Sequence, residues 1–184
     1  MTAAVDDTPR NSRRVGIPYY TAMPLRRLTV LGGSDPAARP EHLEAASSLG
    51  RLLAENGITL VYDGAVQGPV GALAAALRTA EGRALAAAPE ELAELGDGFL
   101  ALPGGPATLE QLFAIGLAGR EEKPCGLLNS ADYFTGLLTV VDDAVLERFV
   151  RETQRGRLIV DRDPASLLRA LADFRPPETR RQVP

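Results

Sequence analysis

The chain of 184 residues contains no tryptophan and only one cysteine, one histidine and one lysine. Cys125 has no partner for an internal disulfide, and its apolar neighbours predict a buried, unreactive thiol. His42 stands without the second histidine or the cysteine pair of a typical metal site. These scarcities exclude an internal disulfide and predict neither a metal centre nor a thiol nucleophile.

Long apolar runs are also absent. No stretch reaches the ~18 apolar residues that a transmembrane helix needs, and the first residues lack the apolar core of a secretory signal. The net charge of −4 gives no broad attraction to nucleic acid or to an anionic membrane surface. We therefore expect a cytoplasmic protein that binds neither of them.

The composition predicts one domain flanked by two polar ends. Apolar residues make up 45% and charged residues 24% of the chain, which is ordinary for a globular protein of this length. Residues 1–24 are polar and contain three prolines, so we expect a flexible N-terminal tail. Residues 25–175 form the predicted domain, and residues 176–184 a polar C-terminal tail.

Apolar segments typical of buried strands alternate with segments of helical periodicity along this domain. Continuous apolar strands separated by helices indicate a parallel sheet that is covered on both faces. The fold class is therefore α/β, a Rossmann-like doubly wound parallel sheet. Strands are expected at 27–31, 58–62, 82–87, 99–102, 125–128 and 158–160, and helices between 40 and 56 and at 70–79, 89–95, 108–118, 133–149 and 164–174.

Three glycine-rich turns follow predicted strands, at the sheet edge where such folds bind ligands. In the turn at 103–108 a helix is expected to begin at Thr108, whose hydroxyl would cap it and leave free N–H groups facing an anion. No turn spells GxGxxG or GK[ST], which favours a single phosphate over a dinucleotide. The expected ligand contacts are Gly32, Gly33, Ser34, Gly64, Gly68, Gly71, Gly104, Gly105, Ala107 and Thr108.

Four ordered segments carry a family resemblance: GGSDP, LGRLLAENGITLVYDGAVQGPVGALAAAL, GDGFLALPGGPATLEQLF and KPCGLLNSADYFTGLLTVVDDAV. Together they resemble the LOG ("lonely guy") family of nucleoside 5′-monophosphate phosphoribohydrolases, which activate cytokinins and were formerly described as lysine decarboxylases. The resemblance extends over residues 28–174. It implies a Rossmann-like subunit, usually a homodimer, that cleaves the N-glycosidic bond to free base and ribose 5-phosphate without an organic cofactor.

The chain departs from the family motif PGGxGTxxE at catalytic positions. Ala107 replaces the third glycine, and Gln111 replaces the glutamate that acts on the ribose or the attacking water. An amide cannot serve as a general base at neutral pH. Glu110 is a possible substitute, but successive helical residues are turned ~100° apart, so it should point elsewhere. The second turn also gains a negative charge at Asp63, which opposes anion binding unless its side chain faces away.

The family's second catalytic residue is absent as well. The resemblance places an arginine, in a helix with an Arg-Lys pair, shortly before the strand at 99–102. The corresponding residues 87–91 contain no arginine, and the segment between Arg83 and Phe99 is shortened by some tens of residues. Loss of both catalytic residues favours a protein that keeps the fold and has lost the reaction.

Three functions remain open from the sequence. The first is a non-hydrolytic member, a pseudoenzyme that binds a nucleoside monophosphate or another phosphate, or a partner protein. The second is an active phosphoribohydrolase with a rebuilt site, which needs a new carboxylate and a new cation. The third is another ligand on the same fold, as in the related molybdenum-cofactor carriers. The candidates for a rebuilt site are Asp63, Glu90 and Glu110 as carboxylates, and Arg78, Arg83 and Arg120 as cations.

The expected protein partners are implied by the family resemblance more than by the hydrophobic pattern of the sequence. A homodimer is expected because the family forms one, and an active paralogue or a pathway enzyme is the alternative partner. The apolar face of 137–149, with Phe113 and Leu117, fits either a dimer surface or packing on the sheet. Tyr133 and Phe134 are expected in the core.

Overall fold

The computed structural model describes residues 25–118 and 123–176. The predicted tails, 1–24 and 176–184, therefore lie outside the described residues, except for Pro176. Arg120, a candidate cation, also lies outside them. Within the described residues no helix is both long and apolar enough to span a bilayer.

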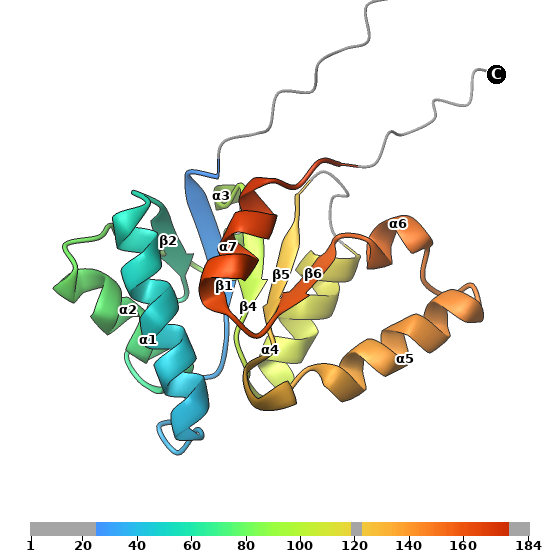
Figure 1. Ribbon diagram of the computed structural model, residues 1–184, viewed down its shortest axis with the longest axis horizontal. Helices are drawn as coiled ribbons and strands as arrows, with labels where there is room; N and C mark the ends of the chain where they lie inside the picture. The colour runs from blue at the N-terminus through green and yellow to red at the C-terminus, as the bar shows by residue number, and fades with distance from the viewer. Residues whose placement is uncertain (1–24, 119–122, 177–184) are drawn as a thin grey trace, which may run out of the picture.

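The described residues form one parallel sheet whose strands have the order β3-β2-β1-β4-β5-β6 (Figure 1). The predicted Rossmann-like α/β class is confirmed. Between β1 and β4 the chain reverses the direction in which strands are added, and open α/β sheets bind ligands outside the carboxyl ends of the strands at such a point. The strands are β1 (Arg27–Leu31), β2 (Thr59–Tyr62), β3 (Ala84–Ala86), β4 (Gly98–Ala101), β5 (Cys125–Leu128) and β6 (Leu158–Asp161).

Helices cover both faces of the sheet (Figure 1). One face carries α1 (Pro40–Glu55), α2 (Gly68–Thr79) and α7 (Pro164–Ala172), whose leucines form the larger core cluster with β1, β2, β4 and β5. The other face carries α3 (Leu92–Leu95), α4 (Pro106–Gln111) and α5 (Thr135–Leu146). Helix α4 continues as a π-helical turn, η1 (Leu112–Leu117). Side chains that alternate along the buried strands therefore contribute to a core on each face of the sheet, which fixes the register of those strands.

The long helix predicted at 133–149 is wrong at both ends. A 3-10 turn, η2 (Ser130–Asp132), precedes it, and α5 ends at Leu146. Arg148 has a φ of 65°, a left-handed conformation that a continuing helix cannot contain. A short helix, α6 (Glu152–Arg155), follows where none was predicted.

Candidate functional site

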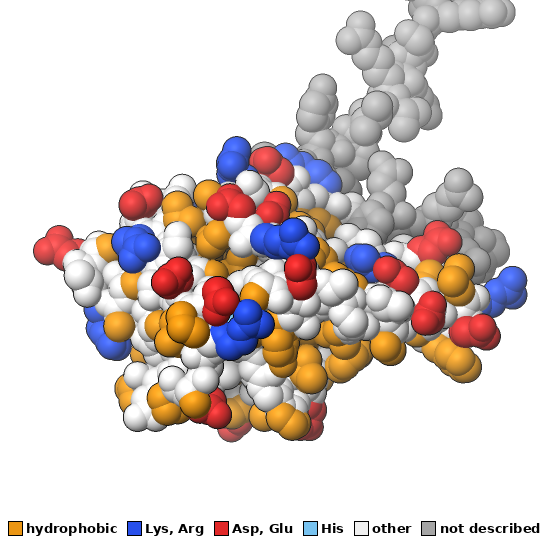
Figure 2. Space-filling view, turned by 60° about the horizontal axis from the view of Figure 1, so that its bottom comes forward, with side chains coloured by type: hydrophobic (Ala, Val, Ile, Leu, Met, Phe, Trp, Pro, Cys, Tyr) orange, Lys and Arg blue, Asp and Glu red, His pale blue; other side chains and the backbone are white. Residues whose placement is uncertain are grey.

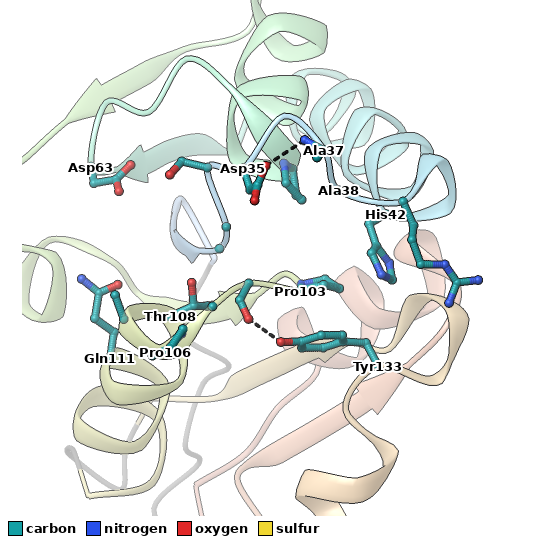
Figure 3. A pocket seen from close by; sticks show the side chains of 18 residues that line it. Asp35, Ala37, Ala38, His42, Asp63, Pro103, Pro106, Thr108, Gln111 and Tyr133 are labelled. Atoms are coloured by element: carbon teal, nitrogen blue, oxygen red, sulfur yellow. Dashed lines mark hydrogen bonds between the residues drawn. The ribbon is translucent and has the colours of Figure 1, made fainter.

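A cavity of about 550 Å³ lies at the carboxyl ends of β1, β2 and β4, beside η2 (Figure 3). Its walls come from the turns after β1 and β4, the first residue after β2, the start of α2 and Tyr133 after η2. This is the size class of small-molecule sites in proteins. The lining residues are Gly32, Gly33, Ser34, Asp35, Ala37, Ala38, Arg39, His42, Asp63, Pro69, Pro103, Gly104, Gly105, Pro106, Ala107, Thr108, Gln111 and Tyr133.

The turns after β1 and β4 are packed backbone against backbone. The N–H of Gly33 donates to the carbonyl of Pro103 at 3.0 Å. A Cβ atom on Gly104 would lie 2.5 Å from the nitrogen of Gly33 and would also collide with the Thr108 hydroxyl. Only glycine therefore fits at Gly104, because two main chains occupy the space that a side chain would need.

The turn before α2 packs against the turn after β1. Gly68 has a φ of 65°, and a Cβ there would lie 2.6 Å from the carbonyl carbon of Ser34. The N–H of Val70, in the first turn of α2, donates to the carbonyl of Gly33 at 3.3 Å. The three glycine-rich turns identified in the sequence thus meet around Gly33, as the parallel topology requires of neighbouring strand ends.

Helix α4 begins two residues earlier than predicted. Its N-cap is Gly105, without a side-chain cap, and Pro106 occupies the first helical position, where its fixed φ suits a helix start. The predicted capping role of Thr108 is therefore wrong, because this residue already lies in the first turn. The first helical hydrogen bond runs from the N–H of Leu109 to Gly105 at 3.2 Å. The N–H groups of Ala107 and Thr108 precede it, which leaves them available to an anion.

Gln111, at the end of α4, lines the cavity together with residues of the first turn of this helix, and Glu110 is not among the lining residues. Figure 3 shows Gln111 on the α4 side and Asp63 across the cavity from it. Asp63 is exposed, and its carboxylate accepts the N–H of Ala65 at 3.0 Å. The negative charge that the sequence places in the second turn therefore borders the cavity instead of facing away.

The charged lining residues are two aspartates and one arginine. Asp35 accepts the N–H of Ala37 at 2.8 Å, and Arg39 pairs with Glu41 at 2.9 Å. Both members of that ion pair are more than half exposed, so the guanidinium remains accessible to a ligand. A phosphate would therefore rely on backbone N–H groups and on Arg39, against the field of Asp35 and Asp63.

Sequence reasoning missed a polar cluster at the other end of the cavity. The Nδ1 of His42 lies 2.7 Å from the hydroxyl oxygen of Ser130, and the hydroxyl of Tyr133 donates to the carbonyl of Gly104. The rings of His42 and Tyr133 meet edge to face, with their centroids 5.8 Å apart. Burial and the Arg39 guanidinium lower the pKa of His42, which is therefore uncharged at neutral pH.

The core position predicted for Tyr133 is wrong, whereas Phe134 is fully buried as expected. Tyr133 is 41% exposed and lines the cavity. Ala131 and Asp132, with φ of 46° and 61°, turn the chain so that two successive aromatic rings face different surroundings. The only signal in the sequence was the place of these residues relative to the predicted elements. Tyr133 follows the end of one predicted strand, and His42 stands near the start of the helix that follows another.

The predicted ligand contacts divide into two groups. Gly32, Gly33, Ser34, Gly104, Gly105, Ala107 and Thr108 line the cavity. Gly64, Gly68 and Gly71 do not line it, and they shape the loop around it instead. Gly71, for example, leaves room for the backbone of Val66, which any Cβ at this position would overlap.

The described residues contain no group of three or more histidine, cysteine, aspartate or glutamate side chains arranged to hold a metal ion. Burial raises the pKa of the Cys125 thiol to about 12. The sulfur is therefore protonated at neutral pH and sits in the core of β5, as its apolar neighbours predict.

Sequence comparison identifies relatives over most of the chain. Residues 78–171 match the family model described as "Possible lysine decarboxylase". The cytokinin riboside 5′-monophosphate phosphoribohydrolase of Rhodococcoides fascians is 31% identical over 79% of this chain and 89% of its own. The cytokinin riboside 5′-monophosphate phosphoribohydrolase LOG7 of Arabidopsis thaliana is also 31% identical, over 82% of this chain and 83% of its own.

Solved structures with the same fold are more distant in sequence. The molybdenum cofactor carrier protein of Chlamydomonas reinhardtii has a TM-score of 0.62 at 19% identity, covering 79% of this chain and 95% of its own. The molybdenum cofactor binding protein of Rippkaea orientalis has a TM-score of 0.60 at 21% identity, over 80% and 95%. At such identities the likeness concerns the fold alone.

Proposed function

From the premise that the chain belongs to the LOG family of phosphoribohydrolases, we propose that its cavity binds a nucleoside 5′-monophosphate, or a similar small phosphate ester, without hydrolysing it at an enzymatic rate. The observation that carries this proposal is Gln111. It lines the cavity at the position where the family motif has its catalytic glutamate, and the adjacent Glu110 does not line it.

The reaction of the family explains why an amide at Gln111, in place of a carboxylate, matters. Departure of a base from ribose develops positive charge on the sugar ring, which a nearby carboxylate stabilises, and the attacking water needs a proton acceptor. A glutamine side chain carries no charge and accepts no proton at neutral pH. Phosphate binding does not need that residue, because it uses the N–H groups at the start of α4 and the favourable end of the helix dipole.

A ligand-binding assay separates binding from chemistry. We expect adenosine 5′-monophosphate and cytokinin riboside 5′-monophosphates to raise the melting temperature in proportion to the logarithm of their concentration, with no release of free base. The corresponding nucleosides without phosphate are the matched control and should give a much smaller rise. An equal rise in melting temperature with nucleosides would contradict a site that recognises the phosphate. Base release at an enzymatic rate would contradict the hypothesis that the protein does not hydrolyse its ligand.

A second candidate function is an active N-glycosidase with a rebuilt site, and Asp63 is the observation that favours it. Its carboxylate borders the cavity across from Gln111 (Figure 3). Glu90 and Glu110 do not line the cavity, and neither do Arg78 and Arg83, which leaves Arg39 as the lining cation. If base release is observed, Asp63→Asn should abolish it while the melting-temperature rise with ligand is kept.

We also propose that two copies of the chain associate through exposed apolar side chains of α5, of the turn that follows it and of η1, called here the α5 surface. Figure 2 shows hydrophobic side chains gathered along the lower right of the molecule. Leu117 and Val141 are buried against the sheet, so those positions of the predicted face serve packing. The α5 surface consists of Phe113, Val140, Leu146 and Phe149, which are 41%, 62%, 80% and 85% exposed.

Charge on the α5 surface should dissociate the pair. We expect Leu146→Glu with Phe149→Glu to convert a dimer into a monomer in light scattering coupled to gel filtration, because two buried carboxylates per subunit would lose their hydration. The control is Val66→Glu, because Val66 is a similarly exposed apolar residue that is distant in sequence from the α5 surface. This change should leave the molecular mass of the dimer in solution unchanged. A monomeric unaltered protein would shift the proposal to a different partner, an active paralogue or a pathway enzyme.

A further inference from the structure

One part of the sheet lacks the cover that doubly wound sheets normally have. On the face of β1 and β2 that carries α3, the core consists of Leu31, Val61 and Leu92. Helix α3 is only 4 residues long and meets the carboxyl-terminal halves of those strands. The edge strand β3 is exposed throughout. The amino-terminal end of this face is therefore open, at the place where the segment between Arg83 and Phe99 is short.

The open end carries a row of polar side chains set by the sheet register. Arg27 of β1 pairs with Thr59 of β2, and the pairing of Leu60 with Ala84 places Thr59 beside Arg83. Residues at matching positions of neighbouring parallel strands point to the same face, and neighbouring strands lie ~4.8 Å apart. Two guanidinium-bearing side chains therefore flank one threonine hydroxyl, with their backbones roughly 10 Å apart.

These residues border a second cavity, of about 620 Å³, at the opposite sheet edge from the cavity described above. Leu85, 41% exposed, supplies an apolar wall. One guanidinium nitrogen of Arg83 donates to the carbonyl of Gly57 at 3.1 Å, which holds this side chain over the neighbouring loop. The lining residues are Arg26, Arg27, Gly57, Thr59, Arg83 and Leu85, three of which are arginines and none of which is acidic.

Acidic side chains of the described residues do not neutralise the arginine charges at this second cavity. Arg26, Arg27 and Arg83 form no ion pair with an acidic side chain among the described residues. Asp97 lies on the other side of β1, where its carboxylate accepts the backbone N–H groups of Arg26 and Arg27 at 2.9 and 2.8 Å. Arg27 and Arg83 lie on the same face of the sheet and carry like charges that repel each other, so these charges do not add to the stability of the fold.

We propose that this second cavity is a binding site for a small phosphate-bearing anion. Arginine donors and a threonine hydroxyl are the groups that hold tetrahedral oxyanions, and charge-assisted bonds from arginine are among the strongest available. The occupant comes from outside the chain, since the terminal segments 1–24 and 177–184 each carry one more basic than acidic residue, three against two and two against one. The site is separate from the candidate cavity and independent of the function proposed for it.

The test counts phosphate sites on the whole chain. We expect inorganic phosphate to bind in equilibrium dialysis, and Arg27→Gln combined with Arg83→Gln to remove one site by weakening it about a hundredfold, since each lost charged hydrogen bond is worth roughly a factor of ten or more. Both residues are exposed, so the variant should fold, and its melting temperature should stay close to that of the unaltered protein, because relief of like-charge repulsion offsets the loss of the hydrogen bond from Arg83 to Gly57.

A matched variant removes two arginines elsewhere. Arg51→Gln with Arg78→Gln makes the same change of net charge on α1 and α2 and should leave phosphate binding intact. Thr59→Val should weaken the same site several-fold, because it removes one neutral hydrogen bond without changing charge. If both double variants bind phosphate with the same affinity and stoichiometry, the proposal is overturned, whether or not the candidate cavity binds nucleotides.

Discussion

Replacing Gln111 by glutamate is expected to give the protein measurable phosphoribohydrolase activity. Glutamate has the same length as glutamine, and α4 already directs this position into the cavity (Figure 3). The variant would supply a carboxylate next to the bound sugar, where it can take the proton of the attacking water. General base catalysis typically contributes about 10²- to 10⁴-fold, so free base release from nucleoside 5′-monophosphates should rise by about that factor over the unaltered protein.

The neighbouring residue gives the control. Glu110→Gln removes one carboxylate from the same helix turn without altering the cavity lining, so it should change neither base release nor ligand binding. The measurement is chromatographic detection of free base from adenosine and cytokinin riboside 5′-monophosphates. Equal, low release by Gln111→Glu and the unaltered protein, with ligand binding retained, would contradict the expectation that a carboxylate at this position restores the reaction. Higher base release by the unaltered protein than by Gln111→Glu would instead favour Asp63 as the catalytic carboxylate.

The sequence predicts the frame of the site well because local chemistry dominates there. The segments 27–31 and 125–128, each rich in apolar residues, become strands with those same bounds. Gly33 and Gly104 follow β1 and β4, and because these strands are parallel neighbours, their carboxyl ends bring the two turns together. Gln111 enters the cavity because its helical phase relative to the turn is fixed by α4.

The remaining parts of the site depend on tertiary contacts that no local pattern encodes. Tyr133 faces the cavity because Ala131 and Asp132 adopt positive φ, which is rare for residues other than glycine. His42 lines the cavity with its Nδ1 2.7 Å from the hydroxyl oxygen of Ser130, which is 88 positions away in the sequence. The open end of the β1–β3 face likewise results from how little of the sheet α3 covers, which depends on the placement of α3 as well as on its length.

Replacing Gly104 by alanine is expected to damage both stability and ligand binding. The added methyl group would lie 2.5 Å from the nitrogen of Gly33 and would overlap the hydroxyl of Thr108, and a main chain cannot retreat as a flexible side chain can. Overpacking of this kind costs about 1–3 kcal/mol, which for a chain of this size lowers the melting temperature by roughly 2–4 °C per kcal/mol. Separating the two turns would also move the N–H groups of α4, so the rise in melting temperature with nucleoside monophosphates should be lost.

The adjacent glycine provides a matched comparison, because the chemical change is identical and the surroundings differ. No atom lies within 4 Å of a Cβ at Gly105, and its φ of −81° suits any residue. Gly105→Ala should therefore leave the melting temperature of the free protein within about 1–2 °C, or raise it slightly by restricting the unfolded chain. Equal destabilisation by the two variants would show that contact between the turns after β1 and β4 does not hold the site together. A loss confined to Gly104→Ala would assign ligand binding to that contact, because both variants keep every polar side chain of the cavity.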